Sequence, residues 1–414
     1  MQSNEGFPRI RHLFARVATP RRPRRALVLV RGPDTTPFLH GLCTAHLTRY
    51  ANEQGPVCTS TCFLDRRGRM LFEALVWIHG PERVYLDIDG RVVGLALRHL
   101  TLHRMRARVA WEHLPATLYV EAFAHQGSGS NTDTRSGTVK QVETRVSAAG
   151  HEEMHAIDPR SPVLGMRRWQ CLTSSTPACT TMPGTGQHKR CYHSYWLAEA
   201  HRVLHAIPQG IQDVVPGQSL PLECNFEQLG AIAFDKGCYL GQELTARTHY
   251  TGVIRKRTVA GILSPDATDA LQRAEAAAAF LQRPPDATLP PELALLFPSE
   301  VLAWPGPALK QQLLRVESDT VERPQLEPVA SAATQKRSVA TLGTIIANLA
   351  TALVPLADTD LHAAVPGTQR LLRVSGRSPA SIANWYFAWW IPPYLQAIAS
   401  STSVSPVSSA TQES

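Results

Sequence analysis

The order of strands and helices in the first part of the chain limits the folds that this sequence can adopt. Six segments read, in order, as a strand, the two strands of a hairpin, another strand, a helix and a returning strand. They cover residues 27–30, 56–64, 69–78, 84–88, 91–103 and 106–111. A strand and a hairpin followed by a helix predict an antiparallel α+β layer, because a doubly wound fold would alternate strands with helices. No glycine-rich phosphate loop follows any of these strands.

The run at residues 234–257 carries the most specific chemical pattern. Its cysteine, Cys238, stands three residues before Gly241 and two after Lys236, and the segment after the glycine is rich in helix formers, with Glu243 in its first turn. A nearby cation raises the thiolate fraction of a cysteine, and the thiolate attacks electrophiles or binds metals. The pattern predicts an accessible thiol at a bend before a helix. Covalent attack, transient ligation of iron or a cluster, and a structural role all stay open.

The spacing of this run resembles the Lys-Gly-Cys-Tyr-x-Gly-Gln-Glu signature of the YgfZ/GcvT-like family, whose members are related to folate-binding aminomethyltransferases. The continuation at residues 243–249 and 252–257 is similar to the mitochondrial branch, whose members help mature [4Fe–4S] proteins. Residues 220–225 also resemble the family. In the family an asparagine and an acid often stand where this chain has Ala45 and His46.

This resemblance implies a site built around one thiol. Cys238 would be the essential residue. The residues that would shape its loop are Lys236, Gly237, Tyr239, Gly241, Gln242 and Glu243. Tetrahydrofolate binds in a central channel in the family, and Glu243 and Arg247 are the candidates to contact it here. The departure at Ala45 and His46 weakens that expectation.

The resemblance also implies an α+β fold, with two related α/β layers in a ring-like body and a small C-terminal β-barrel. The chain would begin with a transit peptide at 1–25 and an N-terminal α+β domain at 26–124. A flexible insertion at 125–150 and a second α+β domain with the cysteine motif at 151–252 would follow. The barrel, with insertions, would occupy 253–377, and residues 378–414 would form an aromatic and serine-rich tail.

The distribution of charge and the use of cysteine indicate the subcellular localisation of the protein. Residues 1–25 carry seven arginines and one acid, which is +6 of the net charge of +8 over 414 residues. The basic balance is therefore typical of a mitochondrial presequence and not of a nucleic-acid partner. Eight irregularly spaced cysteines fit a reducing compartment such as the matrix, and the Cys58 and Cys62 pair is interpreted as core packing. No apolar run is long enough to span a membrane.

The function implied by the resemblance is assembly of [4Fe–4S] clusters on mitochondrial client enzymes, without a classical turnover reaction. A-type iron–sulfur carrier proteins would be the partners. A cluster needs about four ligands, and no second cysteine has a suitable spacing, so Cys238 would be a ligand shared with a partner and the chain would hold no metal of its own.

Two other functions stay open. One is a tetrahydrofolate-dependent, aminomethyltransferase-like one-carbon enzyme, which would not need Cys238. The other is a docking scaffold that uses the aromatic run at residues 385–391, either at a membrane interface or against a partner. Packing of that run against the last barrel strands is the simpler interpretation.

Overall fold

Strand β1 (Arg25–Arg31) is buried on both of its faces. Leu27 and Leu29 pack into one apolar core, and Val28 and Val30 pack into another on the opposite side. Successive side chains of a strand point to opposite faces, so a strand of this kind needs a layer on each side. The two layers around β1 are helices on one face and a second sheet on the other.

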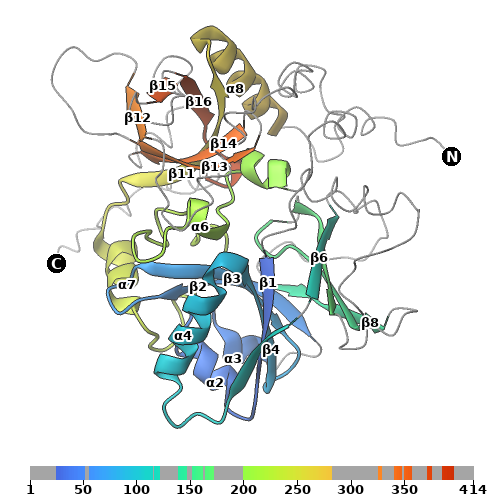
Figure 1. The fold of residues 1–414 in the computed structure, drawn as a ribbon. Coiled ribbons are helices and arrows are strands. Elements are labelled where there is room, and N and C mark those ends of the chain that lie inside the picture. The colour runs from blue at the N-terminus through green and yellow to red at the C-terminus, as the bar shows by residue number, and fades with distance from the viewer. Residues whose placement is uncertain are drawn as a thin grey trace, which may run out of the picture.

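The sheet that contains β1 has six antiparallel strands in the order β5-β1-β4-β3-β2-β7. Its other strands are β2 (Val57–Leu64), β3 (Met70–Ile78), β4 (Arg83–Asp89), β5 (Ala110–Leu114) and β7 (Val139–Gln141). Helices lie over one face of the sheet in Figure 1. They are α2 (Thr35–His40), α3 (Leu47–Ala51), η1 (Gly90–Val92) and α4 (Val93–His103).

The other face of this sheet packs against a second, four-stranded antiparallel sheet with the order β6-β10-β9-β8. Its strands are β6 (Ala116–Glu121), β8 (Glu143–Val146), β9 (Glu152–Ile157) and β10 (Met166–Cys171). Trp77 of the first sheet and Trp169 of the second are fully buried in the core between them. Large aromatic side chains bury the most apolar area per residue, so these two tryptophans contribute strongly to the contact between the layers.

A closed barrel of six strands forms the C-terminal part, in the order β11-β14-β13-β12-β15-β16. The strands are β11 (Lys256–Ser264), β12 (Gln325–Pro328), β13 (Ala340–Ile346), β14 (Leu349–Pro355), β15 (Leu371–Val374) and β16 (Tyr386–Trp390). Helix α8 (Ala267–Leu281) packs on the outside of the barrel, next to a helical segment at 199–204. Figure 1 shows the barrel at one end of the molecule and α7 (Gln242–Thr251) beside the first sheet. The predicted α+β class with a C-terminal barrel is confirmed.

The aromatic run near the C-terminus belongs to this barrel. Strand β16 pairs with β11 and β15, Trp390 is 1% exposed, and its indole Nε1 donates to the Leu204 carbonyl at 3.2 Å. The interpretation of residues 385–391 as an interfacial or recruiting tail is therefore wrong, and packing against the barrel is correct. The run is apolar because β16 closes the barrel and most of its side chains are buried there, so no membrane contact is needed to explain it.

These observations come from a computed structural model. It describes residues 25–51, 56–114, 116–121, 139–146, 152–161, 164–171, 199–281, 325–328, 340–346, 349–356, 371–374 and 385–395. The predicted presequence, apart from Arg25, and the last part of the serine-rich tail lie outside these residues. Among the described helices, none combines the length and the apolar character that crossing a membrane requires.

Two local expectations differ from the structure. The returning strand predicted at 106–111 is β5, at Ala110–Leu114, which pairs with β1. The predicted insertion at 125–150 contains β7, which extends the first sheet, and β8, which belongs to the second. Each difference depends on strand pairing between segments that are distant in sequence.

A group of buried charged residues joins the two sheets. Its members all have side chains that are at most 4% exposed. They are Arg25, Glu73, Asp87, Asp158, Arg160 and Arg167, called here the buried ion cluster. Burial would raise the pKa of Asp158, but Arg160 and Arg167 lower it to about 2. The three carboxylates and three guanidinium groups balance, which is the condition under which buried charges are tolerated.

Arg25 is the first residue of β1, although the predicted N-terminal domain begins at 26. Its Nε atom lies 2.6 Å from Asp87 Oδ1, and a guanidinium N–H donates to Glu73. Burial lowers the pKa of Arg25, and the two carboxylates more than offset this and raise it. The side chain was predicted to belong to the transit peptide at 1–25, whereas the structure uses it inside the first sheet.

Candidate functional site

Five cysteines have side chains that the structure describes, and Cys238 is the exposed one among them. The other four of these, Cys43, Cys58, Cys62 and Cys224, are buried. Burial raises the pKa of the Cys43, Cys58 and Cys62 thiols, which keeps them protonated and unreactive. Among these five cysteines, Cys238 is therefore the one whose sulfur a metal or a partner protein can reach.

Lys236 anchors the loop that carries this thiol. Its ammonium donates to the main-chain carbonyls of His40 at 2.7 Å, Cys43 at 2.7 Å and Ala45 at 2.9 Å. A lysine ammonium has three N–H bonds, and all three are used in these contacts. The lysine also lies over the Tyr239 ring, with Nζ 4.8 Å from its centroid. Burial lowers the pKa of Lys236.

The expected activation of Cys238 by Lys236 therefore has no hydrogen bond to support it. The ammonium points into the main chain of residues 40–45, and the thiol whose pKa it lowers, against the larger effect of burial, is the buried Cys43. Lys236 shapes the site by holding the 235–240 loop against the segment after α2. The Leu240 N–H, which donates to the Gly41 carbonyl at 3.0 Å, strengthens the same contact.

Gly241 fixes the bend between the thiol and helix α7. It precedes the helix with a φ of +79°, and a Cβ atom there would lie 2.4 Å from the Asp65 carbonyl oxygen. Gly68, in the turn between β2 and β3, has a φ of +78°, and its own Cβ would lie 3.0 Å from the Gly241 carbonyl oxygen. The two glycines thus let the hairpin turn and the helix N-terminus approach more closely than side chains would allow. Gln242 closes the bend, since its N–H donates to the Tyr239 carbonyl at 3.2 Å.

Substitution of Gly241 by alanine should destabilise the protein by about 2 to 4 kcal/mol, because a side chain adds both left-handed backbone strain and a clash with main-chain atoms. Gly237 provides the matched control, since a Cβ atom there would meet nothing within 4 Å. Gly237→Ala should change the free energy of unfolding by less than about 0.5 kcal/mol. Denaturant unfolding of both variants measures the difference, and equal stabilities would show that the bend does not need its glycine.

The remaining predicted site residues divide between the core and the surface. Tyr239 is 7% exposed and packs in an apolar cluster with Cys62, Leu64 and Phe226. The side chain of Glu243 is exposed on α7, and so is that of Arg247. The structure thus brings Lys236, Gly241 and Gln242 together around the thiol loop, and it places Glu243 and Arg247 on the outer face of the helix.

A hollow of about 600 Å³ lies beside α7 and is lined by Arg67, Arg69, Gly217, Gln218 and Leu244. Neither Glu243 nor Arg247, the residues expected to contact tetrahydrofolate, lines this hollow. That contact therefore stays a prediction.

The two positions where the chain departs from the family pattern have structural roles here. Ala45 is 3% exposed, and its carbonyl is one of the three acceptors of Lys236. His46 precedes α3, and its Nδ1 accepts the N–H of Arg49 at 3.2 Å, which is the hydrogen bond of a helix N-cap. Both residues therefore support the segment against which the thiol loop is held.

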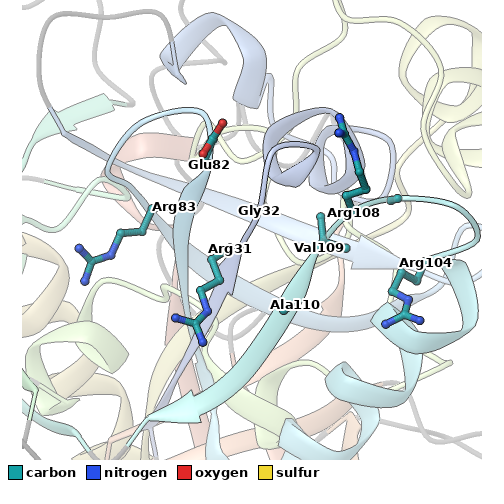
Figure 2. Close-up of a pocket in the computed structure, with 9 residues that line it drawn as sticks. Arg31, Gly32, Glu82, Arg83, Arg104, Arg108, Val109 and Ala110 are labelled. Carbon is teal, nitrogen blue, oxygen red and sulfur yellow. The ribbon is translucent and has the colours of Figure 1, made fainter.

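A second hollow, of about 720 Å³, lies at the end of β1 and β5 and is lined by Arg31, Arg83, Arg104 and Arg108. Figure 2 shows that these side chains point apart and do not converge on one point. Arg108 is paired with Asp34, and Arg104 lies over the Trp111 ring. Because the guanidinium groups diverge and have partners, this hollow is a weaker candidate for a binding site than the thiol loop. No group of three or more His, Cys, Asp or Glu side chains in the described part of the chain is arranged to hold a metal ion.

Sequence reasoning missed the residues that support the far end of α7. The His249 ring stacks on Phe234, with centroids 3.7 Å apart, and its Nδ1 lies 2.8 Å from Glu227 Oε1. The Tyr250 ring meets the edge of Phe234 at a centroid distance of 6.2 Å. These contacts join α7 to the segment that leads into Cys238. The aromatic residues at 234, 249 and 250 were the available signal, but they did not specify which rings would meet.

The fold that surrounds this site is that of the aminomethyltransferases. A solved structure of glycine cleavage system aminomethyltransferase T from Bartonella henselae matches with a TM-score of 0.51 and 10% identity, over 94% of this chain and 90% of that chain. At this identity the match concerns the fold alone. No family model matches the sequence.

Sequence comparison points to one particular kind of protein. The chain is 35% identical over 243 residues to the mitochondrial iron–sulfur cluster assembly factor IBA57 of Mus musculus, and equally to that of Homo sapiens. Each match covers 56% of this chain and 63% of the relative. An IBA57 homolog of Phaeosphaeria nodorum is 30% identical over 244 residues, which are 57% of this chain and 53% of that protein. The chain therefore spans less than two thirds of these relatives.

These comparisons confirm the resemblance to mitochondrial iron–sulfur cluster assembly factors of the YgfZ/GcvT-like family. The relatives are named as mitochondrial proteins, in agreement with the mitochondrial address predicted from the arginine-rich N-terminus.

Proposed function

We propose that this chain is an assembly factor for mitochondrial [4Fe–4S] proteins, that it works in the matrix, and that Cys238 is the residue through which it acts. The observation that carries the proposal is the exposure of this one thiol, while Cys43, Cys58, Cys62 and Cys224 are buried. The names of the relatives support the class of function.

Ligation suits this thiol better than enzymatic attack. A catalytic thiol is activated by a nearby base or cation, and the ammonium of Lys236 donates instead to the main-chain carbonyls of residues 40, 43 and 45. As a ligand, the sulfur would lose its proton when it bonds to iron, so binding would release one proton for each thiol. A cluster needs about four ligands, and the partner would supply those that this chain lacks. A-type iron–sulfur carriers are the proposed partners, and [4Fe–4S] enzymes are the proposed clients.

Cys238→Ser should abolish the function without unfolding the protein. In cells depleted of the endogenous factor, the wild-type chain should restore aconitase activity, and the serine variant should leave it near the depleted level. Because the side chain is exposed, its thermal unfolding temperature should stay within about 2 °C of the wild type. A mitochondrial dehydrogenase without a cluster serves as the control activity. Full restoration of aconitase by the variant would contradict the proposal.

The alternative is an aminomethyltransferase-like one-carbon enzyme, which the shared fold favours. Against it, Glu243 and Arg247 are exposed on α7 and line neither described hollow. Calorimetry with tetrahydrofolate and a turnover assay with an aminomethyl carrier separate the two functions. We expect no turnover, and product formation that survives Cys238→Ser would favour the enzyme.

A further inference from the structure

The end of helix α4 and the turn after it carry positive charge without a balancing acid. Residues 98–111 contain four arginines and no aspartate or glutamate. Arg98 and Arg106 are exposed, and neither forms an ion pair with a described residue. A surface with charges of one sign attracts a partner of the opposite sign. The exposed residues of this segment that the argument uses are called here the α4 tip, and they are Arg98, Leu102, Arg104, Met105 and Arg106.

The α4 tip also projects two large hydrophobic side chains into solvent. Leu102 is 74% exposed and Met105 is 86% exposed, the two highest values among the large hydrophobic side chains of the described residues. Arg98 and Leu102 are four residues apart in α4, so they lie on one face of the helix. Met105 follows at the apex of a turn in which the Ala107 N–H donates to the Arg104 carbonyl at 2.8 Å. Its φ of +47° is rare for a residue with a side chain, and the turn holds the methionine away from the core.

The hollow at the end of β1 and β5 extends the positive charge beyond the tip. Arg104 and Arg108 line it together with Arg31 and Arg83, and Glu82 is the one acid among the described residues of this lining. Figure 2 shows that the four arginine side chains spread apart. A compact anion would need guanidinium groups that converge, whereas a surface with many phosphates can meet groups that are spread over a face. Charge complementarity therefore indicates an extended anionic partner.

The position of the tip suits a partner with a flat surface. Figure 1 shows the loop after α4 at the end of the molecule that lies opposite the barrel. The two exposed apolar side chains and the arginines of the tip are at most eight residues apart in sequence, across one helix end and one tight turn. A flat anionic surface can therefore meet both kinds of side chain at this end of the molecule.

Basic and apolar side chains together fit a lipid bilayer better than a nucleic acid. At a membrane surface the guanidinium groups bind lipid phosphates, and apolar side chains enter the boundary between the headgroups and the acyl chains. A nucleic acid offers phosphates but no apolar layer for Leu102 and Met105. Proteins that bind single strands stack the bases on exposed aromatic rings, whereas the rings beside the tip, Phe38 and Trp111, are half-buried and stack on each other.

We propose that the α4 tip is a membrane-binding element that docks this protein on a bilayer rich in anionic phospholipids. Arg98, Arg104 and Arg106 bind the phosphates, and Leu102 and Met105 enter the headgroup boundary. Each basic side chain near an anionic membrane strengthens binding by about fivefold, so three arginines and two apolar side chains give a reversible, peripheral attachment. The inference goes beyond the proposed function and does not depend on the thiol.

The test measures binding of the full-length chain to vesicles by co-sedimentation. One set of vesicles contains equal parts of phosphatidylcholine and phosphatidylglycerol, and the other contains phosphatidylcholine alone. In every protein tested, the six arginines of residues 1–24 are replaced by glutamine, so that the arginine-rich N-terminus adds no attraction of its own. The chain should bind the anionic vesicles at least tenfold more tightly than the neutral ones. Salt at about 1 M, where the Debye length is about 3 Å, should remove most of that difference.

One pair of substitutions tests the apolar contact. Leu102→Ser with Met105→Ser should weaken binding to the anionic vesicles at least tenfold. Tyr250→Ser with Val253→Ser is the matched control, because these side chains are 67% and 65% exposed at the end of α7 and just beyond it. The control should bind within twofold of the wild type. Both variants should unfold within about 2 °C of the wild type, since all four side chains are exposed.

A second pair tests the charge. Arg98→Gln with Arg106→Gln should weaken binding to the anionic vesicles at least tenfold and should leave binding to the neutral vesicles unchanged. Arg66→Gln with Arg255→Gln removes the same charge from exposed positions outside the tip and should bind the anionic vesicles within twofold of the wild type.

Three results would overturn the proposal. The first is a wild-type chain that does not bind the anionic vesicles, and the second is equal binding by the tip variants and their controls. The third is a chain that binds a DNA duplex through Arg98 and Arg106, without a need for Leu102 and Met105, and does not bind vesicles. Cys238→Ser should bind the vesicles as the wild type does, so a failure of membrane docking and a failure of the role of the thiol are observed separately.

Discussion

Replacement of Arg25 by methionine should lower the free energy of unfolding by about 3 to 5 kcal/mol, which is the range for removal of one partner from a buried ion pair. The substitution leaves Glu73 and Asp87 with exposed side-chain fractions of 2% and 0% and without the guanidinium that pairs with both. Arg167 still contacts Asp87 at 3.1 Å, but the buried ion cluster then holds one net negative charge. Denaturant unfolding of the purified protein measures the loss.

Arg31→Met is the matched control at the other end of the same strand. The side chain of Arg31 is 63% exposed, and its carboxylate partner, on Glu112, lies 4.0 Å away. Exposed pairs of this kind contribute about 0 to 1 kcal/mol, so the control should differ little from the wild type. Similar losses for Arg25→Met and Arg31→Met would show that the buried ion cluster does not stabilise the first sheet.

The contacts of Arg25 also bear on the predicted presequence. A protein that begins at Ala26 should show the instability of Arg25→Met, so we expect that a cleaved presequence would end before Arg25. Sequencing the N-terminus of the imported protein tests this, and a mature chain that begins after Arg25 would contradict it.

Lys236→Met should lower the free energy of unfolding by about 2 to 4 kcal/mol, because it leaves the carbonyls of His40, Cys43 and Ala45 without their donor. Methionine keeps most of the side-chain length, so the loss reports the hydrogen bonds more than the packing. Lys256→Met, at an exposed position in β11, should have little effect. Equal stability of the two variants would mean that the three contacts do not anchor the loop.

The lysine substitution should also weaken the function while the thiol remains. Without its anchor the 235–240 loop should sample several conformations, and hydrogen exchange at Leu240, whose N–H donates to Gly41, should accelerate. Cells that depend on Lys236→Met should then show reduced aconitase activity at equal protein level. Unchanged exchange and unchanged activity together would remove Lys236 from the site.

Local patterns predicted the elements that depend on neighbouring residues. The hairpin of β2 and β3, with Gly68 at its turn, follows from alternation and a glycine. Helix α7 follows from helix formers after a glycine, and the position of Cys238 before it follows in the same way. The antiparallel α+β class was predictable because hairpins and short connections exclude parallel sheets.

Contacts between distant segments were not predictable in this way. Lys236 donates three hydrogen bonds, and each acceptor carbonyl belongs to a residue more than 190 positions earlier in the sequence. The same limit applies to β16, which closes the barrel by pairing with β11, and to Arg25, which meets carboxylates of β3 and β4. A sequence pattern reports which face of an element is apolar, but it does not report which other element will cover that face. The exposure of Glu243 and Arg247 also depends on how α7 packs, so it could not be predicted from their charges.

The proposed function depends most directly on whether Cys238 is a ligand of a cluster shared with a partner. The purified full-length chain is mixed with a cluster-loaded A-type carrier, the complex is isolated, and its iron content and visible absorption and circular dichroism spectra are recorded. If Cys238 is a shared ligand, the wild-type complex should keep the cluster and the Cys238→Ser complex should lose it, with Cys62→Ala as a control that removes a buried thiol. A Cys238→Ser complex with wild-type iron content and an unchanged spectrum would contradict it.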